Sequence, residues 1–177
     1  MKIRKTLVGL TIGILTTVSI LNIWNIHKAK AEFGDNDYQK AGCSNFVTGT
    51  YLTTIKNANG NFASRALITL TKEGNLIVGD SNQGGILGQF NGFTTSQGTW
   101  VCNGTRGITA RVFNFSISNS GGTGIARNDY SATFNPRTQT VEGTIKLSFF
   151  GLEDNPLQGN GQNGGSFSFT GEFVTTR

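Results

Sequence analysis

The amino-acid sequence of 177 residues has few of the side chains on which enzyme active sites and metal sites commonly depend. It holds one histidine, one methionine, two prolines and two cysteines. The histidine, His27, lies in a segment that we expect to be removed, which leaves a mature chain without histidine. Such a chain excludes Ser-His-Asp and Cys-His catalytic groups and a histidine-based zinc or iron site. We therefore expect no metal and no cofactor.

An excess of positive charge is also absent from the mature part of the chain. The whole sequence carries 15 Lys and Arg against 10 Asp and Glu. Five of the basic residues precede Glu32, whereas all ten acids lie at or after it, so the charges balance from Glu32 onward. A neutral chain gives no electrostatic attraction to DNA, RNA or an anionic membrane. We predict no nucleic-acid partner.

Residues 1–31 have the three parts of a signal peptide. A basic start is followed by an apolar stretch over 7–26 and by Ala29-Lys30-Ala31, a small-residue cleavage pattern. We predict cleavage after Ala31 and an exported product, periplasmic or secreted. The alternative is an uncleaved anchor, because about 20 apolar residues can span a bilayer. No later run is apolar enough, so we predict no membrane span in the mature chain.

Alternation of apolar and polar residues runs through the rest of the chain, with no sustained helical period. Turn sequences such as Asn59-Gly60 and Asn135-Pro136 separate the alternating runs. Mostly tight connections between eight strands predict an all-β fold, an eight-stranded antiparallel up-and-down β-barrel formed by residues 46–177. The expected strands lie near 46–55, 62–71, 76–81, 93–103, 107–117, 124–134, 140–150 and 166–175.

Pairing these strands across their turns predicts which side chains face the interior. The last strand should turn Phe167, Phe169 and Phe173 inward. On the outer face, Arg65 with Asp80 and Arg127 with Asp129 should form solvated ion pairs. The expected cross-strand pairs are Tyr51 with Ala66, Ile68 with Gly79, Leu70 with Ile77, Phe134 with Val141, Ala132 with Gly143, Tyr130 with Ile145 and Asn128 with Leu147.

The strand over 107–117 carries a positive charge among aromatic residues. We expect Phe113 and Phe115 to face the interior, and Arg111 then faces it as well, because residues two apart share a face. A buried guanidinium needs a partner, for which a Tyr hydroxyl, Asn128 or a carboxylate on a ligand would serve. The alternative is a pairing slip that leaves Arg111 at the rim.

The two ends of the expected barrel have different connections. The longer connections, at 56–61, 82–92, 118–123 and 151–165, share one end, which we expect to be the mouth. Loop 151–165 is then either a lid or a Gly- and Asn-rich connector. An inward glycine also recurs two residues before a large side chain, at Gly49, Gly98, Gly143 and Gly171. It either lets a strand coil tightly or leaves room for a ligand.

Cys43 and Cys102 are an even pair in a chain that we expect to be exported, which favours a disulfide. The alternative is two separate buried thiols. A disulfide would tie the N-terminal segment 32–45 to the closed end of the barrel, opposite the mouth.

Several segments together resemble a family of small exported bacterial proteins. They are Thr50-Tyr51-Leu52, residues 62–76, Asp80 to Gly85, Gln97-Gly98-Thr99-Trp100, Ala126 to Tyr130 and Phe169-Thr170-Gly171. The resemblance implies a fold similar to calycin and allene-oxide-cyclase-like barrels, and it implies no particular activity. The chain departs from lipocalins because Gly98-Thr99-Trp100 lies in its fourth strand rather than its first.

We expect the barrel to bind a small, largely apolar and possibly acidic molecule in its interior. Arg111 and Asn128 would be its polar anchors, and the expected walls are Tyr51, Trp100, Phe113, Phe115, Tyr130 and Phe149. A second hypothesis is a cofactor-free cyclase or isomerase that uses Arg111 and Tyr130 in the same cavity. A third is a structural or interaction module of the cell envelope with a filled barrel. The oligomeric state is not predicted.

Overall fold

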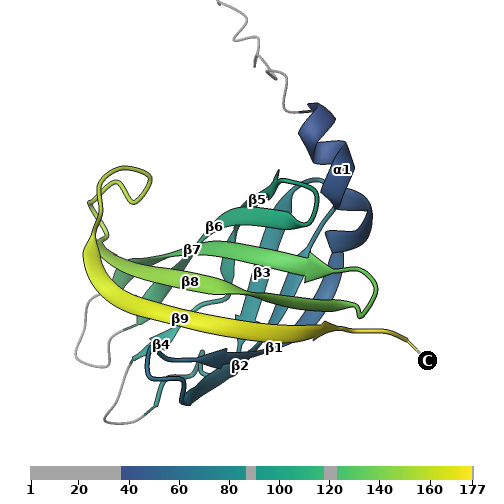
Figure 1. Cartoon of the computed structure of the whole chain (residues 1–177). Coiled ribbons are helices and arrows are strands. Elements are labelled where there is room, and N and C mark those ends of the chain that lie inside the picture. The colour runs from purple at the N-terminus through teal and green to yellow at the C-terminus, as the bar shows by residue number, and fades with distance from the viewer. Residues whose placement is uncertain (1–36, 87–90, 118–122, 177) are drawn as a thin grey trace, which may run out of the picture. The chain divides into compact units, whose positions relative to one another are not determined.

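The structure is a computed structural model, and it describes residues 37–86, 91–117 and 123–176. The expected signal peptide, residues 1–31, lies outside the described residues. Most of the described chain forms one sheet that closes on itself, with a short helix at one end (Figure 1). No helix in this part of the chain is long and apolar enough to cross a membrane.

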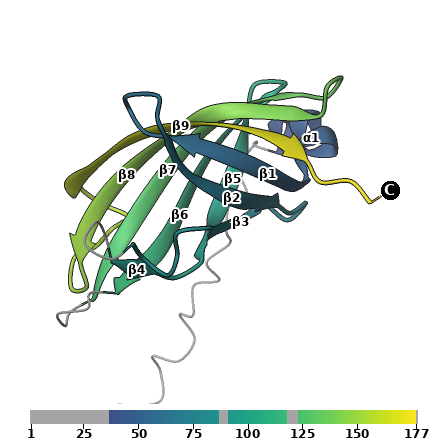
Figure 2. The same ribbon diagram turned by 90° about the horizontal axis from the view of Figure 1, so that it is seen from below.

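The strands follow one another around a barrel, and each pairs antiparallel with the next. The sheet runs β1-β2-β3-β5-β6-β7-β8-β9, and β9 pairs with β1 to close it. Figure 2 shows β6, β7 and β8 side by side on one side of the barrel. The elements are α1 (Asp37–Val47), β1 (Gly49–Lys56), β2 (Phe62–Leu70), β3 (Asn75–Asp80), β4 (Gly92–Phe93), β5 (Ser96–Asn103), β6 (Gly107–Ile117), β7 (Thr123–Asn135), β8 (Thr140–Gly151) and β9 (Gln162–Phe173).

The closed eight-stranded antiparallel barrel confirms the predicted architecture. All eight expected strands are present, and β4 is an additional two-residue strand that pairs with β6. Helix α1 was not predicted. Its inward side chains Cys43 and Val47 stand four residues apart, one helical turn, and the segment is too short to show a longer period.

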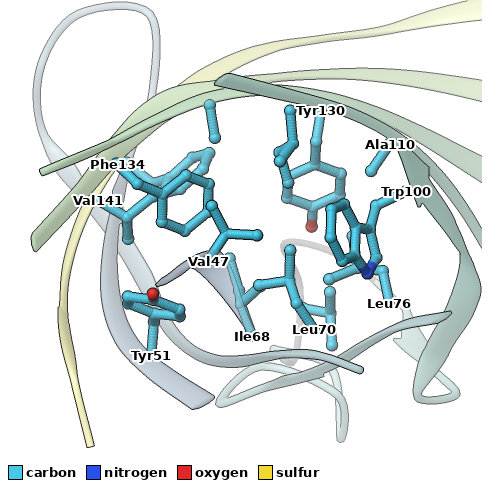
Figure 3. Packing of buried hydrophobic residues seen from close by; sticks show 14 of the residues in the cluster. Val47, Tyr51, Ile68, Leu70, Leu76, Trp100, Ala110, Tyr130, Phe134 and Val141 are labelled. Atoms are coloured by element: carbon cyan, nitrogen blue, oxygen red, sulfur yellow. The ribbon is translucent and has the colours of Figure 1, made fainter. Parts of the chain in front are cut away.

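Apolar side chains fill the half of the barrel next to α1. Val47, Leu70, Leu76 and Trp100 are almost completely buried there. Figure 3 shows side chains from α1 and most of the strands pointing toward one centre, Trp100 and Tyr51 among them. The space left within this cluster is about 10 Å³, room for one water molecule at most. This half is therefore a packed core.

A disulfide joins Cys43 of α1 to Cys102 of β5, as the sequence predicted. Both sulfur-bearing residues are buried at the filled end. The covalent link holds α1 against the last part of β5, so the helix closes this end of the barrel.

The predicted strand registers are right for one hairpin and wrong for two. In β7–β8, Phe134 pairs with Val141 and Tyr130 with Ile145, as expected. In β1–β2 the predicted pairing is two residues off, and Tyr51 pairs with Ile68. The shift accompanies a bulge between Ile55 and Lys56, which the alternating pattern cannot reveal.

The predicted β2–β3 register is wrong by one residue, which exchanges the two faces of β3. Gly74 adopts φ 90° in a tight turn, and the turn pairs Ile68 with Val78 rather than with Gly79. A one-residue shift moves every side chain of a strand to the opposite face. Val78 and Asp80 therefore face the interior, and the expected outer ion pair of Arg65 with Asp80 does not form.

Candidate functional site

The half of the barrel away from α1, here called the open half, differs in chemistry from the packed core. Inward-facing positions on β2, β3, β5, β6 and β7 are mostly polar there, Ala126 of β7 excepted, whereas those on β8, β9 and β1 are apolar. The polar wall consists of Ser64, Asp80, Ser96, Asn114 and Asn128. The apolar wall consists of Leu147, Phe149, Phe167 and Ile55. The inward-facing side chains of the open half thus form a polar wall and an apolar wall next to the packed core.

Asp80 ends β3 on the polar wall. Its Oδ2 accepts a hydrogen bond from Ser64 Oγ at 2.9 Å, and its Oδ1 accepts one from the backbone N–H of Asn82 at 2.8 Å. The second bond is an Asx-turn that starts the connection after β3. Among the described residues Asp80 is the one charged side chain that faces the barrel interior, and it makes no ion pair there.

Asn114 lies on β6 next to Ser96, and it is 5% exposed. Its Nδ2 donates a hydrogen bond to Ser96 Oγ at 2.9 Å. Its Oδ1 is buried and accepts no hydrogen bond from any described residue. A buried amide oxygen without a partner is costly, so this position lowers the stability of the fold.

Tyr130 lies between the packed core and the open half. Its ring packs edge-to-face on Phe169, with ring centroids 5.9 Å apart. Burial and, second, the negative charge of Asp80 raise the pKa of the Tyr130 hydroxyl. The hydroxyl therefore stays protonated at physiological pH. Neither it nor the side-chain amide of Asn128, two residues earlier on β7, forms a hydrogen bond with another described residue.

Two of the predicted wall residues belong to the packed core instead. Trp100 donates from Nε1 to the carbonyl oxygen of Thr71 at 3.1 Å. Tyr51 donates to the carbonyl oxygen of Phe46 at 3.3 Å, and burial raises the pKa of its hydroxyl to about 12. Both side chains hold the closed end together.

The prediction that Arg111, Phe113 and Phe115 face the interior is wrong. The β5–β6 pairing sets Trp100 opposite Ala110 and Gly98 opposite Val112, and these residues face inward with Asn114. The large side chain of Trp100 needs the space that the small side chain of Ala110 leaves. The face of β6 that carries Ala110 is therefore the inward one. Phe115 is consequently 53% exposed on the outer face.

Outside the barrel, Arg111 and Arg127 both pair with Asp129. Arg111 Nε contacts Asp129 Oδ1, and Arg127 Nε lies 3.0 Å from Asp129 Oδ2. Arg127 is on the outer face as predicted, but it is buried rather than solvated, because the loop between β8 and β9 covers it. It donates from one terminal nitrogen to the carbonyl oxygens of Pro156 and Gly159, at 2.9 and 3.1 Å. This part of the loop is therefore fastened to the outer face of β7.

Of the predicted site residues, the structure brings together Asn128, Tyr130 and Phe149. The sequence analysis missed Ser64, Asp80, Ser96 and Asn114. Ser64 and Ser96 lie in step with the inward-facing residues of their strands, and this alternation could have identified them as inward. Asp80 was missed because of the wrong β3 register, and Asn114 because the two phenylalanines beside it were taken as the inward residues.

Comparisons of the chain with protein-family models, with curated proteins and with solved structures give no significant match. The resemblance to calycin-like barrels therefore stays a prediction.

Proposed function

We propose that the protein binds one small amphiphilic molecule in the open half of its barrel. The observation that supports this most directly is a set of unused hydrogen-bonding groups on one wall. The Asn128 amide and the Tyr130 hydroxyl face inward from β7, and neither bonds to a described residue. A bound molecule would satisfy them, and its apolar part would lie against Phe149 and Phe167.

The packed core limits the size of this ligand. Because the other half of the barrel leaves about 10 Å³ free, the molecule would occupy the open half alone or extend outward past the rim. Phe149, which is 38% exposed, would contact such an extended tail. This proposal revises the expected binding mode, in which Arg111 anchored an acidic ligand deep inside.

Nuclear magnetic resonance gives a direct test with the purified protein. Small amphiphiles such as n-hexanol are titrated while the side-chain amide signals of Asn114 and Asn128 are followed. We expect saturable shifts at both amides and none at Asn135, which is exposed at the end of β7 on the closed side of the barrel. Shifts confined to the outer face, or no saturable shift with any probe, would contradict the proposal.

Native mass spectrometry of protein purified from an exporting host complements this titration. We expect a stoichiometric adduct that is released on denaturation, and its mass would define the chemical class of the ligand. Protein that is bare, and that also fails to bind any amphiphile in the titration, would exclude the proposed function.

An interaction module is the second candidate, and three exposed side chains favour it. Leu52, Leu67 and Ile77 lie on the outer faces of the adjacent strands β1, β2 and β3, each more than 40% exposed. Exposed apolar patches commonly mark protein contacts. The cyclase hypothesis is weakened, because Arg111, one of its two proposed residues, points away from the interior.

A further inference from the structure

We infer that the polar end of the ligand is a protonated amine and that Asp80 is its counter-ion. This inference rests on the proposed function, because it names the chemical class of molecule that the open half would take. It replaces the acidic ligand that the sequence suggested, since the interior charge is negative rather than positive.

The charge distribution around the open half carries the inference. The basic side chains of β2, β6 and β8, namely Arg65, Arg111 and Lys146, all project from the outer face. The inward carboxylate of Asp80 is partly buried, and its two hydrogen-bond donors, Ser64 and the Asn82 backbone, are neutral. A carboxylate removed from water is stabilised far more by a cation than by neutral donors alone.

The other unused groups on the polar wall fit the same head group. An alkylammonium has three N–H donors and no acceptor. Asp80 can accept one of these hydrogen bonds. The side-chain carbonyl of Asn128 is a second acceptor on this wall. A carboxylate head group would instead be repelled by Asp80.

A purely structural role for Asp80 makes a different prediction. Asp80 caps the turn after β3 through the Asn82 N–H, and it accepts the Ser64 hydroxyl. Asparagine keeps one oxygen, which accepts the Asn82 N–H in the same Asx-turn, and its Nδ2 can donate to Ser64 Oγ, which then acts as the acceptor. The substitution Asp80→Asn therefore keeps the turn while removing the negative charge, which separates the two roles.

The test uses three probes with the same apolar chain: n-hexylammonium, n-hexanol and n-hexanoate. Their dissociation constants are measured by calorimetry on the wild-type protein, on Asp80→Asn and on the control Glu142→Gln, which removes an exposed outer carboxylate on β8. We expect wild type to bind hexylammonium at least tenfold more tightly than hexanol, and hexanoate most weakly. Asp80→Asn should lose this preference and bind hexanol within about twofold of wild type, whereas Glu142→Gln should match wild type.

Equal affinity of wild type for hexylammonium and hexanol would overturn the inference and leave the proposed function intact. A preference for hexylammonium that survives in Asp80→Asn would also overturn it. Failure of all three probes to bind would instead argue against the proposed function itself. The ranking on wild type does not require any variant to fold.

Discussion

Arg111 and Arg127 pair with the same carboxylate, that of Asp129, but the rest of the protein covers them to different degrees. The side chain of Arg111 is 43% exposed and that of Arg127 is 7% exposed, although both pair with Asp129 on the same outer face. Arg127 also lies over the Phe150 ring, 5.0 Å from its centroid. Water screens the exposed pair, whereas the buried guanidinium holds two loop carbonyls that have lost water.

We predict that Arg127→Lys destabilises the protein by about 2 kcal/mol, because lysine cannot reproduce the fixed fork of donors beneath the loop. Proteolysis within residues 152–161 should also become faster. Urea unfolding and limited digestion measure the two effects. The matched variant Arg111→Lys should change the free energy of unfolding by less than about 0.5 kcal/mol. Equal effects of the two substitutions would show that the loop contacts contribute little.

At the scale of the strands, the recurring inward glycines set how closely neighbours approach. A Cβ on Gly143 would meet the carbonyl oxygen of Ser131 and lie 2.7 Å from Cζ of Phe169. A Cβ on Gly98 would collide with the backbone of Arg111 and Val112, and one on Gly171 would lie 2.6 Å from Cγ2 of Thr53. At these three positions, therefore, the glycines provide close strand packing rather than space for a ligand.

We predict that Gly143→Ala lowers the free energy of unfolding by roughly 1–3 kcal/mol, because the added methyl group overpacks the β7–β8–β9 contact. Gly79→Ala on β3 is the matched control, since no heavy atom lies within 4 Å of its Cβ position. That substitution should be neutral or slightly stabilising. Chemical denaturation of both variants measures the difference, and a harmless Gly143→Ala would mean that the barrel relaxes around the extra volume.

At the scale of the whole barrel, one end is a packed core and the other is lined by a polar wall and an apolar wall. Helix α1 and the disulfide close the packed end, and the β1–β2 and β8–β9 connections lie at the other. Stability and the proposed binding are thereby separated along the barrel axis. A change in the open half should alter ligand affinity with little effect on the core.

We predict that removing the disulfide with Cys43→Ala and Cys102→Ala destabilises the protein by about 4 kcal/mol. The link spans 59 residues, and in the chain-entropy model it restricts the unfolded chain by about that amount. The melting temperature should fall by roughly 10 °C. Calorimetry on the double variant, and on wild type with a reductant, should give similar shifts. An unchanged melting temperature would show that packing alone holds α1 in place.

Local pattern was sufficient to predict the eight strands of the barrel, their antiparallel order and the disulfide. Alternation with a period of two and glycine- or asparagine-containing turns are properties of neighbouring residues, so they can be read along the chain. The β7–β8 register could be predicted for the same reason, because a tight connection leaves little freedom in pairing.

The candidate site was decided by tertiary structure. The face of β3 depends on one residue in the turn at Gly74, and a shift of one position moved Asp80 from the surface to the interior. On β6, apolar side chains occupy both faces, and only the match of Trp100 with Ala110 shows which face is inward. Strand alternation alone thus determined that this protein is a barrel. Packing between strands decided which side chains line its open half. The alternating pattern does not show which face of β3 or β6 is inward, whereas packing against the neighbouring strands does.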